Sequence, residues 1–247
     1  MTNIITIHSF KKGTGKSQIA ANMATLMANQ GQRVALVEAN IQAPSARYIF
    51  ELEDNAYTLN DYWLGRCTIQ ETLRDLSSIV SAESGQLFVF PCGEEPQDIA
   101  QLVRDGFPPK LFDEGLAMLV DELPLDTLII DGSTGLTEKS LSTLALSSVA
   151  ILVMLLDQRE YQGTGATVEI VHKLQVPRVD LFVNDVPPVF DAMQVQSEVE
   201  QAYHCPVTVL PHSDEMLALG GKGVFCLQYP DHPFTIALKT ASAAYSA

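Results

Sequence analysis

The segment KKGTGKS, residues 11–17, decides how this 247-residue chain is expected to fold. It follows the apolar run Ile4–Ile7 and precedes a stretch, residues 18–24, that has the composition of a helix. A strand, a turn rich in glycine and lysine, and a helix in this order form a cradle for nucleotide phosphates, because turn N–H groups and the helix N-terminus face the anion. Lys16 can reach the β- and γ-phosphates, and the Ser17 hydroxyl suits Mg²⁺.

The phosphate-loop segment departs from the usual motif, which wants a glycine where this chain has Phe10 and has no second lysine. With its extra lysine it resembles the deviant Walker loop of the ParA/MinD family of ATPases, which usually reads Lys-Gly-Gly-x-Gly-Lys-Ser/Thr. The residues that match are Lys11, Gly13, Gly15, Lys16 and Ser17. The match is broken at Lys12, where the family carries glycine. A merely solvated loop is the alternative, which the flanking strand and helix disfavour.

Length and composition are typical of a globular chain. Hydrophobic residues make up 47% of it, so a substantial core can form, and we expect residues 1–247 to form one large α/β domain. No apolar run has the length of a membrane span, and the N-terminus lacks a secretory pattern. The four cysteines, Cys67, Cys92, Cys205 and Cys226, are scattered without a C-x-x-C pair. This spacing favours reduced core thiols of a cytoplasmic protein over a metal site.

The charge balance restricts the direct partners of the chain. Thirty Asp and Glu against 15 Lys and Arg give a formal net charge of −15. Because DNA binding depends on basic side chains that neutralise phosphates, this balance argues against direct DNA or anionic-membrane attachment, although a dimer could assemble a local basic patch. The C-terminal segment Phe234–Ala244 has one lysine and small residues, which favours a packing helix over a membrane-binding tail. Solubility is the simpler reason for the acidity.

Apolar runs alternate with helical stretches along the whole chain. The expected strands are Ile4–His8, Val34–Glu38, Leu87–Pro91, Thr127–Asp131, Val149–Leu156, Val179–Asn184 and Val207–Leu210. The expected helices are Lys16–Asn29, Ile99–Arg104, Leu111–Glu122, Glu138–Ser147, Gln162–Leu174, Ala192–Tyr203 and Phe234–Ala244. Continuous Val/Ile/Leu runs indicate strands covered on both faces. The pattern therefore predicts a P-loop NTPase fold of the α/β class, in which helices flank both faces of a mostly parallel sheet.

The segment between about residues 46 and 85 is less regular. We expect helices and loops next to the second strand, with Asn60–Arg66 at its centre. The aromatic residues of this segment, which include Tyr62 and Trp63, can belong to the core or to a partner surface, and the sequence leaves both alternatives open.

Asp131 ends the apolar run Leu128–Ile130 and is followed by Gly132–Leu136. A phosphate-transferring site needs a metal-orienting carboxylate at the end of a buried strand, which Asp131 supplies. The run resembles the Walker B strand and second switch of the family, with Thr134 at the place of a common proline. We expect Ser17 and Asp131 to be the residues on the metal.

Residues 34–44 align with the first switch of the family, where the usual pattern is Asp-x-Asp. This chain has Glu38 and Asn40 instead. Glu38 is one methylene longer and can reach a metal-bound water, whereas Asn40 can hold a water but cannot accept its proton. Because positioning and charge stabilisation carry most of phosphoryl transfer, we expect slow hydrolysis rather than none. The alternative is that Asn40 merely caps a turn and another carboxylate, such as Glu38, orients the water.

Lys11 has its own predicted role. Across the family two ATP-bound subunits pack face to face, and this lysine crosses to the phosphates of the partner. The resemblance implies an ATP-dependent homodimer in which a cation supplied in trans stabilises the transferring group. Lys12 adds charge nearby, and either strengthens phosphate binding or strains a position better suited to glycine.

Asn184 ends an apolar strand where the family places an adenine-recognising asparagine, and Pro211 aligns with the proline beside the base. Asparagine at a strand end is also a common turn former, so both interpretations stay open. The residues expected to act in catalysis are Lys11, Lys16, Glu38, Asn40 and Asp131. The residues expected to contact nucleotide are Lys11, Lys12, Gly13, Thr14, Gly15, Lys16, Ser17, Gln18, Asn184 and Pro211.

The resemblance covers nearly the whole chain, including Asp157–Thr164, Val176–Arg178 and Tyr229–Pro233. It implies a slow ATPase with ATP and Mg²⁺ as cofactors, which works as a dimerisation switch and positions or regulates a cargo through an adaptor or activating protein. The second hypothesis is a nucleotide-dependent scaffold with negligible turnover, because Glu38 and Asn40 replace the Asp pair. A third class is a metabolic enzyme on the same fold, such as an iron–sulfur reductase or a small-molecule ligase, and the scattered cysteines do not suggest the reductase.

Overall fold

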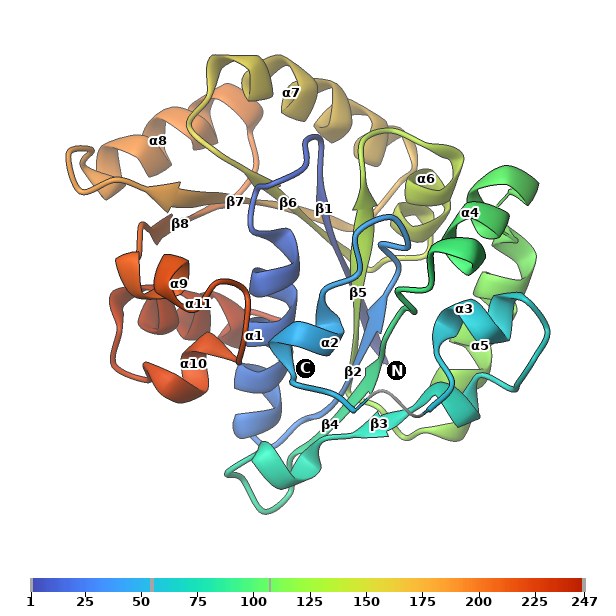
Figure 1. Ribbon diagram of the computed structural model, residues 1–247. Coiled ribbons are helices and arrows are strands. Elements are labelled where there is room, and N and C mark those ends of the chain that lie inside the picture. The colour runs from blue at the N-terminus through green and yellow to red at the C-terminus, as the bar shows by residue number, and fades with distance from the viewer. Residues whose placement is uncertain (1, 54–55, 107, 246–247) are drawn as a thin grey trace.

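The computed structural model describes residues 2–53, 56–106 and 108–245. One sheet with the strand order β3-β4-β2-β5-β1-β6-β7-β8 runs through the molecule (Figure 1). The strands are β1 (Asn3–Ser9), β2 (Arg33–Glu38), β3 (Arg74–Asp75), β4 (Gln86–Phe90), β5 (Thr127–Thr134), β6 (Val149–Met154), β7 (Arg178–Val186) and β8 (Val207–Pro211). All neighbouring strands are parallel except β3 and β4, so the predicted fold class is confirmed.

All seven predicted strands are present, and the eighth, β3, was not predicted. Arg74 and Asp75 pair antiparallel with Val89 and Phe88 of β4 at the edge of the sheet. Two charged residues carry neither an apolar run nor an alternating pattern, so no local signal marks this strand. The predicted strand Val149–Leu156 was two residues too long, because β6 ends at Met154.

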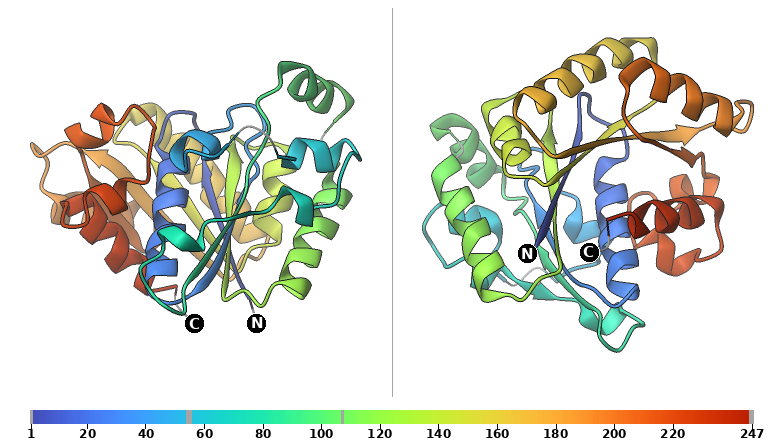
Figure 2. Two further views of the ribbon diagram at one scale, coloured as in Figure 1. Left: turned by 60° about the horizontal axis from the view of Figure 1, so that its bottom comes forward. Right: turned by 180° about the vertical axis from the view of Figure 1, so that it is seen from behind.

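Helices cover both faces of the sheet (Figure 2). They are α1 (Lys16–Asn29), α2 (Ala46–Ile49), α3 (Leu59–Trp63), α4 (Pro96–Asp105), α5 (Pro109–Glu122), α6 (Glu138–Ala145), α7 (Gln158–Lys173), α8 (Ala192–Tyr203), α9 (Asp214–Ala218), α10 (Phe225–Gln228) and α11 (Pro233–Ala243). The bounds predicted for α1 and α8 match the structure. Helix α7 begins four residues earlier than predicted, because the Asp157 side chain caps it by accepting a hydrogen bond from the N–H of Arg159. The short helices α2 and α3 lie in the segment where helices and loops were expected without bounds, whereas α9 and α10 were not predicted.

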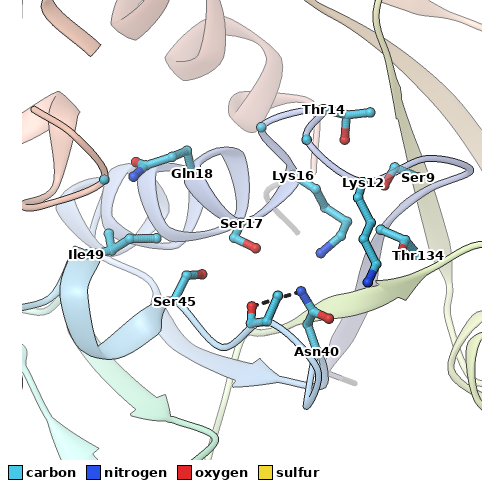
Figure 3. A pocket seen from close by; sticks show the side chains of 14 residues that line it. Ser9, Lys12, Thr14, Lys16, Ser17, Gln18, Asn40, Ser45, Ile49 and Thr134 are labelled. Atoms are coloured by element: carbon cyan, nitrogen blue, oxygen red, sulfur yellow. Dashed lines mark hydrogen bonds between the residues drawn. The ribbon is translucent and has the colours of Figure 1, made fainter. Parts of the chain in front are cut away.

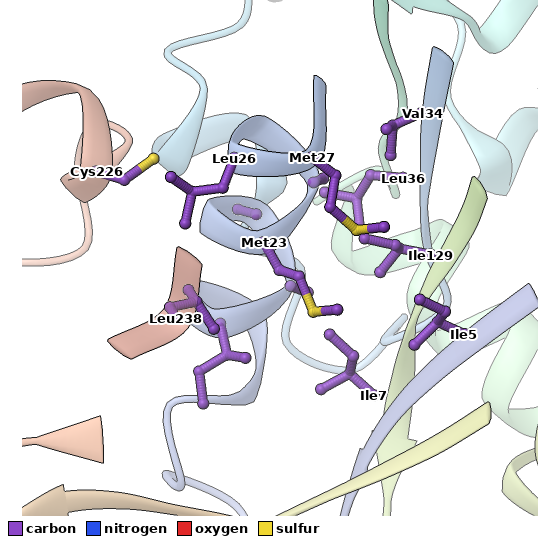
Figure 4. Close-up of a cluster of buried hydrophobic side chains, with 14 of the residues drawn as sticks. Ile5, Ile7, Met23, Leu26, Met27, Val34, Leu36, Ile129, Cys226 and Leu238 are labelled. Atoms are coloured by element: carbon purple, nitrogen blue, oxygen red, sulfur yellow. The ribbon is translucent and has the colours of Figure 1, made fainter. Parts of the chain in front are cut away.

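The strand alternation divides the core between the two faces. Ile5 and Ile7 of β1 are fully buried and face α1, where Met23 and Met27 pack against them (Figure 4). Thr6 lies between them in sequence and faces the opposite way, and its hydroxyl donates to the carbonyl oxygen of Thr143 in α6. Helix α1 therefore packs between the sheet and the C-terminal helices α10 and α11. This packing fixes the position of the phosphate loop, which precedes the N-terminus of α1.

The irregular segment before β4 contains α2, α3, β3 and two short 3₁₀ helices, Gln70–Thr72 and Ser77–Ile79. Tyr62 and Trp63 of α3 are buried in a cluster with residues of α4 and α5. These two aromatic residues belong to the core, so the partner-surface alternative is wrong for them.

The C-terminal segment forms helix α11, which packs against α1 and β8. Phe234 and Leu238 are almost fully buried there, as a packing helix requires. Within residues 2–53, 56–106 and 108–245, no helix combines the length and the apolar character that crossing a membrane demands.

Candidate functional site

The predicted site residues gather at the carboxyl ends of the parallel strands. The segment between β1 and α1 forms the floor of a cavity of about 320 Å³, and the connection after β2 forms the opposite wall (Figure 3). The predicted residues that line this cavity are Lys12, Gly13, Thr14, Gly15, Lys16, Ser17, Gln18 and Asn40. We call this the phosphate cavity. A parallel sheet binds ligands at this edge, because its strand ends and helix N-termini converge there.

The loop contains two glycines in the left-handed region, Gly13 and Gly15, and both have φ of +82°. Gly15 caps α1 and lies against Asn184 of β7, so that an added Cβ atom would lie 2.3 Å from the Asn184 amide nitrogen. The same nitrogen donates a hydrogen bond of 2.8 Å to the carbonyl oxygen of Thr14. Glycine is therefore required at position 15 by both backbone conformation and space.

Lys16 and Asp131 form a buried ion pair, in which the Lys16 ammonium donates to Asp131 Oδ1. Their side chains are each 4% exposed. Asp131 reaches this place because β5 lies beside β1, with Asp131 in register with Ile7. The ion pair joins the first turn of α1 to the sheet, and it places an ammonium and a carboxylate together beneath the phosphate cavity.

Glu38 lies beside Asp131 on the neighbouring strand, and its carboxylate is bound by backbone N–H groups. Its carboxylate accepts hydrogen bonds from the N–H groups of Ser45, Ala46 at 2.9 Å and Cys92 at 2.8 Å. Burial, together with the charge of Asp131, raises the pKa of Glu38 to about 7, and the three N–H groups oppose that rise. Glu38 therefore ties the connection after β2 to the end of β4, and it does not line the phosphate cavity.

Asn40 lies at the wall of the phosphate cavity and also holds the connection after β2. Its Nδ2 donates to the carbonyl oxygen of Ala43 at 3.0 Å, and the Ala43 N–H donates back to the Asn40 carbonyl oxygen (Figure 3). The turn-capping contact expected in the alternative interpretation is thus present, and Asn40 is at the same time one of the residues that line the cavity. A catalytic role for Asn40 stays a prediction.

The two lysines at the start of the loop lie in opposite surroundings. The Lys11 ammonium is 3.2 Å from Asp157 Oδ2 and 3.7 Å from Glu160 Oε1, at the start of α7. Lys12 instead extends into the phosphate cavity beside Lys16 and Asn40 (Figure 3). Asp157 and Glu160 belong to the segment Asp157–Thr164, which carries part of the family resemblance. Two acidic residues three positions apart at the start of a helix could have suggested a partner for a lysine. No pattern in the sequence, however, connects this pair to Lys11.

Asn184 and Pro211 line a smaller cavity of about 160 Å³ behind the loop. Gly13, Thr14 and Gly15 line both cavities, so the two are neighbours across the loop. This places the two predicted adenine contacts on one side of the phosphate cavity, between the ends of β7 and β8. The amide of Asn184 also braces the loop through Thr14, and its contact with a base stays a prediction.

The donors around the phosphate cavity fit a magnesium triphosphate. No Asp or Glu lines it within the described residues, although the chain has twice as many acidic as basic residues. The Thr14 hydroxyl is buried without a hydrogen-bond partner among those residues, and Lys12 and Lys16 provide ammonium groups. Oxygen ligands for a hard cation are available from Ser17 and Asp131. The arrangement can therefore neutralise a polyanion laid across the loop.

Comparisons with known proteins agree with this geometry. Residues 1–105 match the model of the ParA family, described as a NUBPL iron-transfer P-loop NTPase. Over its whole length the chain is similar to an uncharacterized ATP-binding protein of Methanocaldococcus jannaschii, with 28% identity over 256 aligned residues that cover 100% of this chain and 90% of that protein.

Two solved structures share the fold. The septum site-determining protein MinD of Pyrococcus horikoshii, complexed with Mg-ADP, superposes with a TM-score of 0.78 at 20% identity and covers 99% of this chain and 96% of its own. A chain of the MinC:MinD cell division protein complex of Aquifex aeolicus has a TM-score of 0.77 at 16% identity, over 98% of this chain and 95% of its own. At these identities the likeness concerns the fold alone.

Proposed function

We propose that this chain is a slow ATPase of the ParA/MinD family of P-loop NTPases that uses ATP binding as a dimerisation switch. The observation that carries the proposal is the phosphate cavity itself. A left-handed glycine loop, the Lys16–Asp131 ion pair and a wall without carboxylates coincide at the carboxyl edge of the sheet. The Mg-ADP complex of the Pyrococcus MinD supports ATP and Mg²⁺ as the ligands.

Each residue of the phosphate cavity has a defined task in this proposal. Lys16 and Lys12 bind phosphate oxygens, and the loop N–H groups orient them at the N-terminus of α1. Ser17 and Asp131 would hold magnesium, which supplies positive charge to the phosphates when bound. Lys16 lies between Asp131 and the cavity, so its ammonium is shared between the carboxylate and the incoming anion.

Slow turnover follows from the surroundings of the two candidate bases. Glu38 is bound by three backbone N–H groups and is buried away from the cavity, and Asn40 cannot accept a proton at neutral pH. Water can still be positioned by Asn40, and charge stabilisation by lysines remains. Because phosphoryl transfer relies mostly on these two effects, we expect hydrolysis without general-base assistance, about 10²–10⁴-fold below a site that has it.

The proposed dimer requires Lys11 to change partners. In this structure Lys11 pairs with Asp157 of the same chain, and both side chains are about one-third exposed, while the buried Glu160 carboxylate lies 3.7 Å from the same ammonium. Partly exposed ion pairs are worth about 1 kcal/mol or less, so phosphates of a second ATP-bound copy can displace these carboxylates. ATP then favours the dimer because it binds that state better.

A partner protein completes the proposed switch. The solved complex of MinC with MinD supports an adaptor for this chain as well. The net charge of −15 leaves few cations for DNA or an anionic membrane, so we propose that residues 1–247 act as one unit that reaches its cargo through the adaptor. A cytoplasmic location keeps the four free cysteines reduced.

The mass of the protein in solution tests the switch. We expect a monomer without nucleotide and with ADP, and a dimer with ATP and Mg²⁺, measured by light scattering on one preparation. Lys11→Ala should bind ATP but stay monomeric, whereas Lys239→Ala, on the far helix α11, should behave as the unmodified chain does. Equal masses in all three nucleotide states would remove the switch.

The second candidate function is a nucleotide-dependent scaffold with negligible turnover. The saturated contacts of Glu38 and the turn contact of Asn40 favour it, because neither side chain is free to act as a base. Phosphate release separates the two functions. Release that disappears in Lys16→Ala supports the slow ATPase, and ATP binding without release above the Lys16→Ala background supports the scaffold.

A further inference from the structure

We propose that a second cavity next to the phosphate cavity binds a small molecule that carries a carboxylate. It has a volume of about 300 Å³ and lies between the connection after β2, the end of β5 and helix α4. Lys12, Asn40 and Thr134 line both cavities, so they form a common wall. We call this second space the acceptor cavity. The adenine-side cavity with Asn184 adjoins the phosphate cavity through a different set of residues, Gly13–Gly15.

The charge of the acceptor cavity is opposite to that of the chain. Two lysines, Lys12 and Lys139, line it, and no Asp or Glu does so within the part of the chain that the structure describes. The chain as a whole carries 30 acidic and 15 basic residues. A wall of positive sign in such a chain attracts anions, because low-dielectric walls of one sign concentrate counter-ions.

Lys139 is the most distinctive group of this wall. Its ammonium lies 5.1 Å above the ring of Trp63, and burial lowers its pKa to about 8. Cys92 and Glu38 lie near enough to oppose that lowering, and the charge of Lys16 adds to it. A carboxylate that enters the cavity would add a negative charge beside this buried ammonium and so stabilise its charged form further.

The remaining lining indicates an organic anion rather than a free phosphate. The Ser133 hydroxyl is buried without a hydrogen-bond partner among the described residues, and it adds a polar group. Leu102 and Val103 of α4 provide an apolar side. A volume of about 300 Å³ is at the lower end of the range for ligand sites, so the occupant is of metabolite size. A short hydrocarbon chain that ends in a carboxylate fits this lining, because the chain can contact the apolar side and the carboxylate can contact the lysines.

Binding in the two cavities should be coupled through Lys12. One ammonium cannot neutralise a phosphate and a carboxylate with full strength at once, so nucleotide and carboxylate should change each other's affinity by the same factor. The inference concerns binding only and goes beyond the proposed switch. A nucleotide-binding chain with or without turnover would have the same acceptor cavity.

Calorimetric titration of the full chain with a defined set of probes tests the inference. The probes are glutarate, adipate and pentanoate, with pentanamide as the uncharged analogue and inorganic phosphate as the free anion. The titrations are done with saturating MgADP, which keeps the probes out of the phosphate cavity, and without it. We expect the carboxylates to bind in the presence of MgADP and to bind more tightly than pentanamide and phosphate do.

Two pairs of variants locate the binding. Lys139→Gln should weaken carboxylate binding by about tenfold or more, because it removes a charge-assisted hydrogen bond, while Lys239→Gln on α11 should leave it unchanged. Val103 is 56% exposed, so changes there should not disturb folding. Val103→Asp should weaken carboxylate binding by like-charge repulsion, and the neutral Val103→Asn should not. The affinity for MgADP, titrated separately, should stay within about twofold in all four variants, which would keep a failure of nucleotide binding distinct from a failure of this site.

Three results would overturn the inference. The first is that no carboxylate probe binds more tightly than about 1 mM, with or without MgADP. The second is that Lys139→Gln and Lys239→Gln have equal affinities. The third is that inorganic phosphate or pentanamide binds as tightly as the carboxylates.

Discussion

Glu38, the last residue of β2, and Asp131 of β5 are in register on neighbouring parallel strands, and yet they make opposite kinds of contact. Asp131 meets the ammonium of Lys16, a side chain that a ligand can draw away. Glu38 meets three N–H groups of the main chain, from the connection after β2 and from the end of β4. Both carboxylates are almost fully buried. The β5 end of the site is therefore held by a charge pair, and the β2 end is held by the backbone.

This difference shows how one carboxylate of a site can stay available to a ligand while its neighbour stabilises the folded backbone. A side chain that is paired with a lysine can exchange that partner for a metal ion when phosphates bind the lysine. A carboxylate that closes three backbone donors cannot leave without exposing them, at about 1–3 kcal/mol for each unsatisfied group. Glu38 stands where the resemblance predicts an aspartate of the first switch, and in this structure its carboxylate holds the backbone after β2.

The largest expected effect is at the β5 end. Lys16→Ala removes the ammonium that serves both Asp131 and the phosphates, so we expect turnover to fall by about 10²–10³-fold, together with weaker MgATP binding. Phosphate release and a nucleotide titration on the same sample measure the two effects. Unchanged affinity and rate would mean that the ion pair is only structural.

The next effect is at the β2 end and concerns stability. Glu38→Gln places an NH₂ group opposite a backbone N–H, and we expect the free energy of unfolding to fall by about 2 kcal/mol. Denaturant unfolding measures the change. The matched control is Glu94→Gln, because Glu94 is a partly exposed carboxylate on the same side of the sheet, and its pair with Arg47 should be worth under about 1 kcal/mol. Equal losses for the two variants would contradict the structural role of Glu38.

The raised pKa of Glu38 gives this contrast a pH dependence. Between pH 4.5, the ordinary pKa of a glutamate, and about pH 7, the folded chain keeps a proton on Glu38 that the unfolded chain has released. The contribution of Glu38 to the free energy of unfolding therefore falls as pH rises through that window, and it levels off above it. The stability difference between the unmodified chain and Glu38→Gln, measured from pH 5 to pH 8, should decrease with pH. A difference that increases with pH would show that the backbone donors outweigh burial.

A smaller effect is expected when a carboxylate is restored at the cavity wall. Asn40→Asp loses the hydrogen bond to Ala43 but gains a group that can accept a proton from water. We expect phosphate release to rise by about tenfold, the lower part of what general-base assistance provides. Asn40→Ala, which loses the same contact without gaining a base, is the control. A rise in both variants would attribute the gain to loosening of the turn.

The smallest effect concerns Lys11, whose ion pair resembles that of Lys16 in kind but not in burial. Lys11→Ala breaks the partly exposed pair with Asp157 and the longer contact with the buried Glu160, whose carboxylate still accepts from the N–H of Leu155, so the free energy of unfolding of the monomer should change by about 1 kcal/mol. Lys12→Ala, with no ion-pair partner within the described ranges, should leave stability unchanged and weaken MgATP binding. Thermal unfolding and a nucleotide titration measure both, and a loss of stability in Lys12→Ala comparable to that in Lys16→Ala would contradict the contrast.

The parts of the fold that the sequence predicted are those with a strong local signal. The run before the loop, the two glycines with positive φ and the apolar stretch after them define β1, the loop and α1, and the predicted bounds of α1 match the structure. Asp131 was found because it ends a continuous apolar run. Strand β3 was missed, since two charged residues at an edge carry no periodicity.

The partners of the site residues were not predictable. Glu38 is held by Cys92, which lies 54 residues away, and Lys11 is held by Asp157, 146 residues away. Neither distance leaves a local pattern in the sequence. The acceptor cavity is built in the same way from four segments: the phosphate loop, the connection after β2, helix α4, and the stretch from the end of β5 into α6. Of its lining residues, Lys12, Asn40 and Thr134 were noticed beforehand, but nothing in the sequence indicated that they meet at one cavity.

The sequence by itself determined the order of the candidate site segments along the chain: the loop between β1 and α1, the end of β2 with Glu38, and the apolar run that leads to Asp131 in β5. It did so because backbone conformation and apolar periodicity are local properties. The tertiary structure alone decided which way each lysine of the loop extends and whether a buried carboxylate faces a ligand or the main chain. Long side chains can reach several partners, and the one that they meet depends on segments brought together by the sheet.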